Sequence, residues 1–236
     1  MHERIQRYLR ARAAAGREAV PAGAFTLYLH PVMRSHPFLN YAIPDEDAAP
    51  DDGAALVTAA RERGLVPRVE AVAPCAPWVR ELPGFEIELE PPLMVCDEPV
   101  APRSPAELVA VEPGSPHVGA LLAAQHEAFG DPPPTDERIA TWNEHGVAAV
   151  VGGRVVGGAS FSEPMGGMTE VGGIAVLEPF RRQGIAGALT AEATRRGLNA
   201  GAELVLLSPG DDGAERVYER AGFVTASRMI FVRASA

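Results

Sequence analysis

A short run of basic and small residues, RRQGIAGA at 181–188, lies between a strand-like segment and a helix-like segment. Residues 170–176, which include the β-branched Val171, Ile174 and Val176, precede it, and residues 189–198 have the composition of a helix. A strand that leads through a glycine turn into a helix leaves backbone N–H groups unpaired at the positive end of the helix dipole. Small residues let an anion approach that backbone closely. The run therefore predicts a phosphate-binding loop.

Two familiar nucleotide-binding loops fit this run poorly. A Walker loop needs Gly-Lys-Ser/Thr, and the chain contains no lysine. A dinucleotide fingerprint needs three glycines as G-x-G-x-x-G directly after a strand. Gly184 and Gly187 supply only part of that pattern. The sequence thus excludes the first class of loop and gives little support to the second.

The spacing Arg181-x-x-Gly184-x-Ala186 resembles the R/Q-x-x-G-x-G/A signature of the GNAT N-acyltransferase superfamily. That signature holds the pyrophosphate of acetyl-coenzyme A. A strand-like run at 203–208, a tyrosine-containing helix and the pair Gly222-Phe223 follow in the family's order. The resemblance covers the second half of the chain. It implies an α/β (α+β) fold with a mixed central sheet flanked by helices.

The resemblance also implies how the acyl donor binds. In this family the strand before the loop parts from its neighbour, here 205–207, and the pantetheine arm pairs with the exposed backbone. An N–H group near Val176 would polarise the thioester carbonyl. Gly172-Gly173 inside the strand predicts a β-bulge or a close backbone approach, and a flexible strand start is the alternative. The implied cofactor-binding residues are Ile174, Ala175, Val176, Arg181, Arg182, Gln183, Gly184, Ile185, Ala186, Gly187 and Tyr218.

Two residues are expected to be catalytic. Tyr218 matches the tyrosine that protonates the departing coenzyme A thiolate in many family members; a core tyrosine packed beside Phe223 is the alternative interpretation. Glu170 matches the glutamate that orders the water which deprotonates the acceptor amine, and a solvent-facing strand end is its alternative. Glu163 is the second candidate base. Asp211 stands where the family often has a cofactor-contacting asparagine, so that contact is in doubt.

The histidines and cysteines suggest no further chemistry. His117, His126 and His145 fall in the helical region expected to form the acceptor wall, and we interpret them as surface or capping residues. Cys75 and Cys96 are interpreted as reduced thiols. No Cys/His cluster has metal-ligand spacing, so no metal is expected.

The proline-rich residues 99–105 predict a linker between residues 1–98 and a catalytic domain at 106–236. Residues 64–85 and 201–223 share the order strand, short helix and Gly-Phe, so the first part is expected to be a smaller, degenerate GNAT-like domain. A similarity common to any α/β unit is the alternative. No R-x-x-G-x-A run precedes its helix; the acidic residues 49–53 stand there instead, and Arg80 takes the place of the tyrosine.

Hydrophobic periodicity places the elements that must position these residues. Helices are expected at 3–15, 53–63, 76–82, 117–129 and 136–145. Strands are expected at 25–30, 40–43, 68–73, 85–89, 93–96, 147–151, 155–161 and 223–232.

The formal net charge of −10 over 236 residues argues against a nucleic-acid partner. The basic N-terminal residues lack an apolar core, so they predict no signal peptide, and no apolar run is long enough to cross a membrane. A cytoplasmic protein is expected, either a monomer or a homodimer.

The leading hypothesis is an acetyl-CoA-dependent N-acetyltransferase that transfers acetyl directly to a primary amine of a small molecule or peptide. A non-catalytic coenzyme A sensor or scaffold is the alternative from another class. A longer acyl group or O-acylation also stays open.

Overall fold

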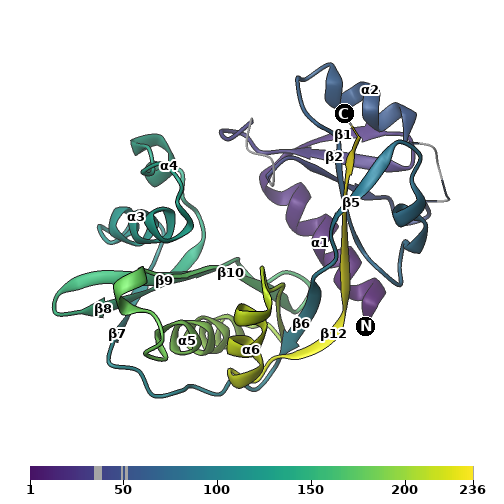
Figure 1. Ribbon diagram of the computed structural model, residues 1–236. Helices are drawn as coiled ribbons and strands as arrows, with labels where there is room; N and C mark the ends of the chain where they lie inside the picture. The colour runs from purple at the N-terminus through teal and green to yellow at the C-terminus, as the bar shows by residue number, and fades with distance from the viewer. Residues whose placement is uncertain (35–38, 49, 51–52, 236) are drawn as a thin grey trace. The chain divides into compact units, whose positions relative to one another are not determined.

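The computed structural model describes residues 1–34, 39–48, 50 and 53–235, which form two compact units (Figure 1). The first unit comprises Met1–Leu93 and Ala226–Ala236, and the second comprises Met94–Thr225. The chain passes between them within β6 (Pro92–Cys96) and within β12 (Val224–Ala234). The sequence predicts the division at the linker; the compact second unit begins before it, and the last strand returns to the first unit.

The first unit contains one sheet in the order β1-β2-β3-β4-β12, with β5 also paired to β12. Strands β3 and β4 are parallel and α2 joins them, whereas the other pairs are antiparallel. Its elements before β6 are α1 (His2–Gly16), β1 (Glu18–Ala22), β2 (Phe25–Leu29), β3 (Tyr41–Pro44), α2 (Ala54–Arg61), β4 (Arg68–Val72), the 3₁₀ helix η1 (Pro77–Glu81) and β5 (Phe85–Leu89).

Two features of the first unit differ from expectation. The helix predicted at 76–82 is the five-residue 3₁₀ turn η1, which begins with Pro77 and is too short to nucleate an α-helix. Strand β1 was not foreseen because it contains Pro21, which an edge strand tolerates. Of the acidic run predicted to replace a phosphate loop, residues 49, 51 and 52 lie outside the described residues.

The second unit has one mixed sheet in the order β6-β11-β10-β9-β8-β7. Its elements after β6 are β7 (Glu107–Val111), α3 (Val118–Phe129), α4 (Asp136–Ala140), β8 (His145–Val151), β9 (Arg154–Phe161), β10 (Met168–Val176), the 3₁₀ turn η2 (Glu178–Phe180), α5 (Ile185–Asn199), β11 (Leu204–Leu207) and α6 (Asp212–Arg220). Helices α3 and α4 lie on one face of the sheet, and α5 lies on the other (Figure 1).

The alternation of side chains along the strands builds two cores in the second unit. Val147 and Ala149 of β8 belong to the larger core, which α5 and α6 cover. Ala148 points the other way, into a smaller core with Leu121 and Leu122 of α3. Since successive side chains of a strand face opposite sides, the parallel pair β10–β11 and its crossover helix α5 are buried on the larger-core side.

The predicted helix at 136–145 is wrong in its second half. Helix α4 ends at Ala140 and has no fully buried residue of its own, and Trp142 just beyond its end packs into the smaller core. His145 instead begins β8 and pairs with Phe161 of β9. Strand β7, which pairs with β8 at the sheet edge, was also missed. The predicted hairpin 147–151/155–161 is confirmed.

Candidate functional site

The predicted phosphate loop leads directly into α5. Gly184 is the residue before the helix and has φ +80°, and no side chain caps the first N–H groups of α5. Arg182 has φ +65°, and among the described residues it alone combines a positive φ with a side chain. That conformation costs roughly 1–2 kcal/mol in an L-residue. Strain of this kind concentrates at functional sites, where the surrounding structure maintains it.

Strand β10 leaves its neighbour β11 after Glu170. The two strands pair in parallel only over 168–170, whereas β11 also pairs with β6 along its opposite edge. On the other side, the register with β9 shifts between Gly172 and Ala175, and Gly173 has φ +59°. The predicted bulge is therefore confirmed. The backbone of 174–176 has no strand partner on its β11 side within the described residues.

Arg181 connects the end of β10 to the end of α3 by two hydrogen bonds. Its Nε donates to the carbonyl oxygen of Val176 at 2.9 Å, and its guanidinium donates to the carbonyl of Ala128 at the end of α3 at 3.2 Å. The side chain thus ties the last residue of β10 to a helix on the same unit. The guanidinium of Arg181 thus places a positive charge beside the loop, and two of its N–H groups are already hydrogen-bonded to backbone carbonyls.

The glycines of the loop contact residues of the predicted linker. A Cβ on Gly184 would overlap the carbonyl oxygen of Arg103, and one on Gly187 would lie 2.8 Å from Cγ of Pro102. The segment 102–103 therefore packs against the first turn of α5. Close packing explains small residues here independently of any phosphate, a reason that the sequence alone does not supply.

We expect Gly184→Ala to lower the free energy of unfolding by about 2 kcal/mol, because it combines a positive φ with an overlap against backbone. Gly172→Ala is the matched control, since its Cβ would meet no atom within 4 Å. Urea unfolding of both variants measures the difference. Equal stability of the two would contradict the observed packing of the loop.

Tyr218 lies on α6 and is 8% exposed. Burial, with a smaller contribution from the charge of Asp211, raises the pKa of its phenol to about 12. Its ring packs 6.3 Å from that of Phe223, measured between centroids. Asp211 caps α6 by accepting a hydrogen bond from the N–H of Ala214 at 2.8 Å. The site therefore contains a neutral, buried phenol, and the core-tyrosine interpretation describes the same packing.

The start of β10 is held on two sides. Glu170, half-buried, exchanges hydrogen bonds with residue 162. Near the bulge, Gln125 of α3 donates from Nε2 to the carbonyl of Gly173 at 2.7 Å and to Ser160 Oγ at 3.2 Å. Sequence reasoning missed Gln125, although a polar residue beside the buried stripe of α3 is a recognisable signal. It fixes the carbonyl at the bulge.

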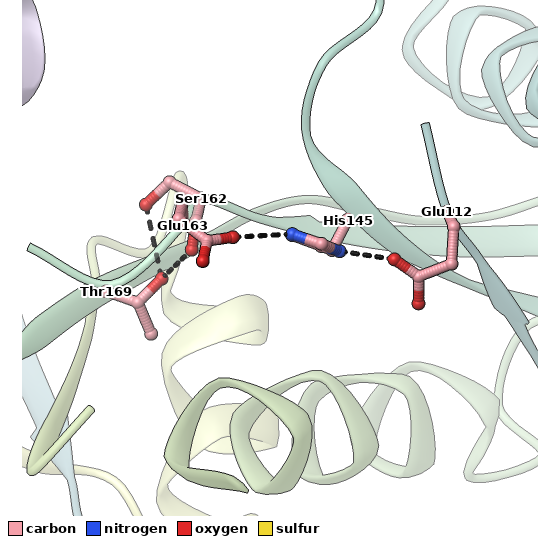
Figure 2. Close-up of polar contacts among 5 residues, drawn as sticks. All are labelled: Glu112, His145, Ser162, Glu163 and Thr169. Carbon is pink, nitrogen blue, oxygen red and sulfur yellow. Dashed lines mark hydrogen bonds and ion pairs between the residues drawn. The ribbon is translucent and has the colours of Figure 1, made fainter. Parts of the chain in front are cut away.

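The three histidines have different surroundings. His117 precedes α3, and His126 Nδ1 lies 2.6 Å from the carbonyl of Pro132. His145 lies between two carboxylates: Nδ1 is 2.5 Å from Glu112 and Nε2 is 2.7 Å from Glu163 (Figure 2). The second candidate base is thus paired with a histidine that we had interpreted as a surface residue.

His145 lines a cavity of about 500 Å³ at the C-terminal end of α5, the end opposite Gly184. Burial alone would lower the pKa of His145, but hydrogen bonds and charges from Glu163 and Glu112 outweigh it and raise the pKa above the usual 6.5. The grouping of these residues could not be read from the sequence, because Glu112, His145 and Glu163 lie in three separate segments of the chain, after β7, at the start of β8 and after β9.

Among the described residues, no group of three or more His, Cys, Asp or Glu side chains is arranged to hold a metal ion. Within the same residues, no helix has both the length and the apolar character that crossing a membrane requires.

Comparison with known proteins adds the following. Residues 117–223 match the model of the Acetyltransferase (GNAT) family. No curated protein matches the sequence significantly. The structure of a GCN5-related N-acetyltransferase from Kribbella flavida is 26% identical, with a TM-score of 0.80, and the match covers 100% of this chain and 96% of that one. This similarity confirms the expected fold class.

Two more distant structures show the same fold. A GCN5-related N-acetyltransferase from Sphaerobacter thermophilus is 22% identical, with a TM-score of 0.63 over 89% of this chain and 80% of that one. A tandem GNAT protein from the clavulanic acid biosynthesis pathway is 15% identical, with a TM-score of 0.59 over 90% of this chain and 78% of that one.

Proposed function

Because residues 117–223 form a domain of the GNAT acetyltransferase family, we propose that the chain is an acetyl-CoA-dependent N-acetyltransferase that acts on a primary amine. The observation that carries the proposal is the parting of β10 from β11 after Glu170, directly before the loop that opens α5. A parted strand offers unpaired backbone groups to an extended ligand. The free start of a helix offers N–H groups to a phosphate.

The loop residues fit the acyl donor as follows. The N–H groups at the start of α5, with Gln183 and Arg182 beside them, would bind the pyrophosphate. The backbone of Ile174, Ala175 and Val176 would pair with the pantetheine arm. An N–H group near Val176 would stabilise the negative charge that develops on the thioester oxygen. Arg181 would act mainly by holding the loop, given its two backbone acceptors.

Two side chains would move protons. Glu170 would take a proton from the acceptor amine, directly or through a water molecule, so that the nitrogen lone pair can attack the thioester carbon. The C–S bond breaks, and the sulfur leaves as a thiolate. Tyr218 would donate a hydrogen bond and then its proton to that sulfur, which prevents the thiolate from attacking the product. Its raised pKa keeps the phenol protonated until that moment. The phenolate would regain a proton from the amine nitrogen as that nitrogen becomes a neutral amide.

The first unit would take no part in the transfer. Arg80, at the position corresponding to the tyrosine, is engaged in an ion pair with Glu90, with 2.6 Å between Nε and Oε1. An arginine guanidinium stays protonated in proteins, so it does not serve as a proton donor to a thiolate. We propose that this unit is a degenerate GNAT-like domain and that the protein works in the cytoplasm.

A thiol-release assay tests the proposal. The purified 236-residue chain is mixed with acetyl-CoA and, one at a time, with polyamines, amino acids, aminoglycosides and peptides that have a free N-terminus. We expect at least one amine to raise the rate of thiol release well above that with water alone, with the acetylated amine detected by mass spectrometry. Release that no amine accelerates would contradict the proposed acceptor class.

A further inference from the structure

His145 is the centre of a three-residue bridge that joins separate elements (Figure 2). Glu112 follows β7, His145 begins β8, and Glu163 follows β9. The side chain of His145 is 26% exposed, while those of Glu112 and Glu163 are 59% and 73% exposed. A histidine that holds one carboxylate at each ring nitrogen ties the loop after β9 to the end of β7 and the start of β8.

The loop after β9 is in turn attached to the start of β10. The N–H of Ser162 donates to the carbonyl of Glu170 at 3.2 Å, and the N–H of Glu170 lies 3.4 Å from Ser162 Oγ. The hydroxyl of Thr169 donates to the carbonyl of Ser162 at 2.5 Å. The residue next to Glu163 therefore contacts Glu170 at both of its backbone groups.

We propose that His145 is a positioning residue: by bridging Glu112 and Glu163 it holds the β9–β10 turn, and through Ser162 it holds Glu170 in place for proton abstraction. The inference rests on the proposed function, in which Glu170 is the base. It adds a residue that never touches the substrate but fixes the one that does.

Only the protonated imidazole can make both contacts as a donor. Imidazolium has two N–H groups, whereas neutral histidine has one, so deprotonation leaves one carboxylate facing a ring lone pair. The other charged groups at the cavity are Arg195 and Arg196 on α5, and both are paired with Glu192. Glu144 precedes His145 and has its own interactions. The two carboxylates on the ring therefore decide its protonation.

The sign of the pH dependence follows from the raised pKa of His145. Below that pKa both contacts exist and the turn is held. As the pH rises through it, one contact is lost and the order at Glu170 falls. The bridge therefore favours activity at pH values below the pKa of His145. The activity also needs the carboxylate form of Glu170, which is the form that accepts a proton.

The test combines amide hydrogen exchange with kinetics on full-length wild type, His145→Gln and Glu163→Gln. His126→Gln is the control, because the ring of that histidine lies against the backbone carbonyl of Pro132 rather than against a carboxylate. Kinetics use acetyl-CoA with the best amine from the thiol-release screen, or with water if no amine accelerates release. In the wild type, we expect protection of the amides of 162 and 170 and kcat to fall together, about tenfold, as His145 deprotonates.

In His145→Gln, protection and kcat should already be about tenfold lower at neutral pH and should lack that alkaline step, with KM for acetyl-CoA unchanged. Glu163→Gln should also lack the step, since an amide can pair with the neutral ring. Unchanged protection and an unchanged pH profile in both variants would overturn the inference, and so would lost protection with normal kcat. If the wild type released no thiol at all, the proposed function would fail, while the exchange data would still decide whether the bridge holds Glu170.

Discussion

The variant Tyr218→Phe is expected to release coenzyme A about a hundredfold more slowly than the wild type while binding acetyl-CoA with unchanged affinity. The substitution removes one hydroxyl from a ring whose remaining atoms stay packed in the core with Phe223. Without a donor, the sulfur must leave as a free thiolate that no neighbouring hydroxyl stabilises. The measurement is kcat for thiol release, together with calorimetric affinity for acetyl-CoA.

The matched control is Tyr28→Phe, which removes a hydroxyl from a tyrosine in the first unit that is 5% exposed. It should leave kcat unchanged. Since the pKa of Tyr218 is about 12, the wild-type profile should show no limb from this group between roughly pH 6 and 9. Unchanged turnover in Tyr218→Phe would remove the tyrosine from the mechanism. Tight binding without turnover in the wild type would support the sensor hypothesis instead.

Glu170→Gln is expected to lower kcat about a hundredfold at neutral pH, because the amide cannot accept the proton that the substrate ammonium group must lose before its nitrogen attacks. The defect should shrink as the pH rises, since bulk solvent then supplies the deprotonated amine. Up to the pKa of the amine, each unit by which the pH is raised should therefore increase kcat of the variant about tenfold. The measurement is the pH–rate profile of thiol release with a saturating amine.

Glu219→Gln is the control for Glu170→Gln. It removes a carboxylate that is exposed on α6, directly after Tyr218, and should leave the profile unchanged. A Glu170→Gln enzyme with normal kcat at neutral pH would show that another group or a water chain takes the proton. A defect that persists at high pH would point to lost structure at β10 rather than to a lost base.

The parts of the site that sequence could predict are those encoded locally. Strand β10, its bulge at Gly172-Gly173, the loop and α5 depend on residues that are neighbours in the chain, since glycine placement and periodicity fix them. The same holds for α6 and its cap Asp211. Local signals also place the tyrosine on the right element.

The parts that sequence could not predict depend on contacts between distant residues. Arg103 lies far from Gly184 in the chain, so its packing against the loop has no local signature. The bridge at His145 needs two glutamates from elements on either side of it. The weak helical pattern of residues 141–145 predicts a helix that includes His145. That prediction fails because the pairing of β8 with β9 draws His145 into a strand.

The central claim is that the start of α5 binds the phosphates of acetyl-CoA, and one calorimetric series tests it most directly. Gln183→Glu adds one negative charge at an exposed position directly before Gly184 without changing the side-chain shape. A carboxylate near a helix start does not destabilise the helix, but it repels a phosphate bound there. Asn199→Asp adds the same charge at the opposite end of α5 and serves as the control.

We expect the wild type and Asn199→Asp to bind acetyl-CoA with equal, micromolar affinity and Gln183→Glu to bind it about tenfold more weakly. An equal loss in both variants would show only a general effect of charge on an anionic ligand. Wild-type protein that does not bind acetyl-CoA at all would contradict the proposed function and the role given to every residue of the loop.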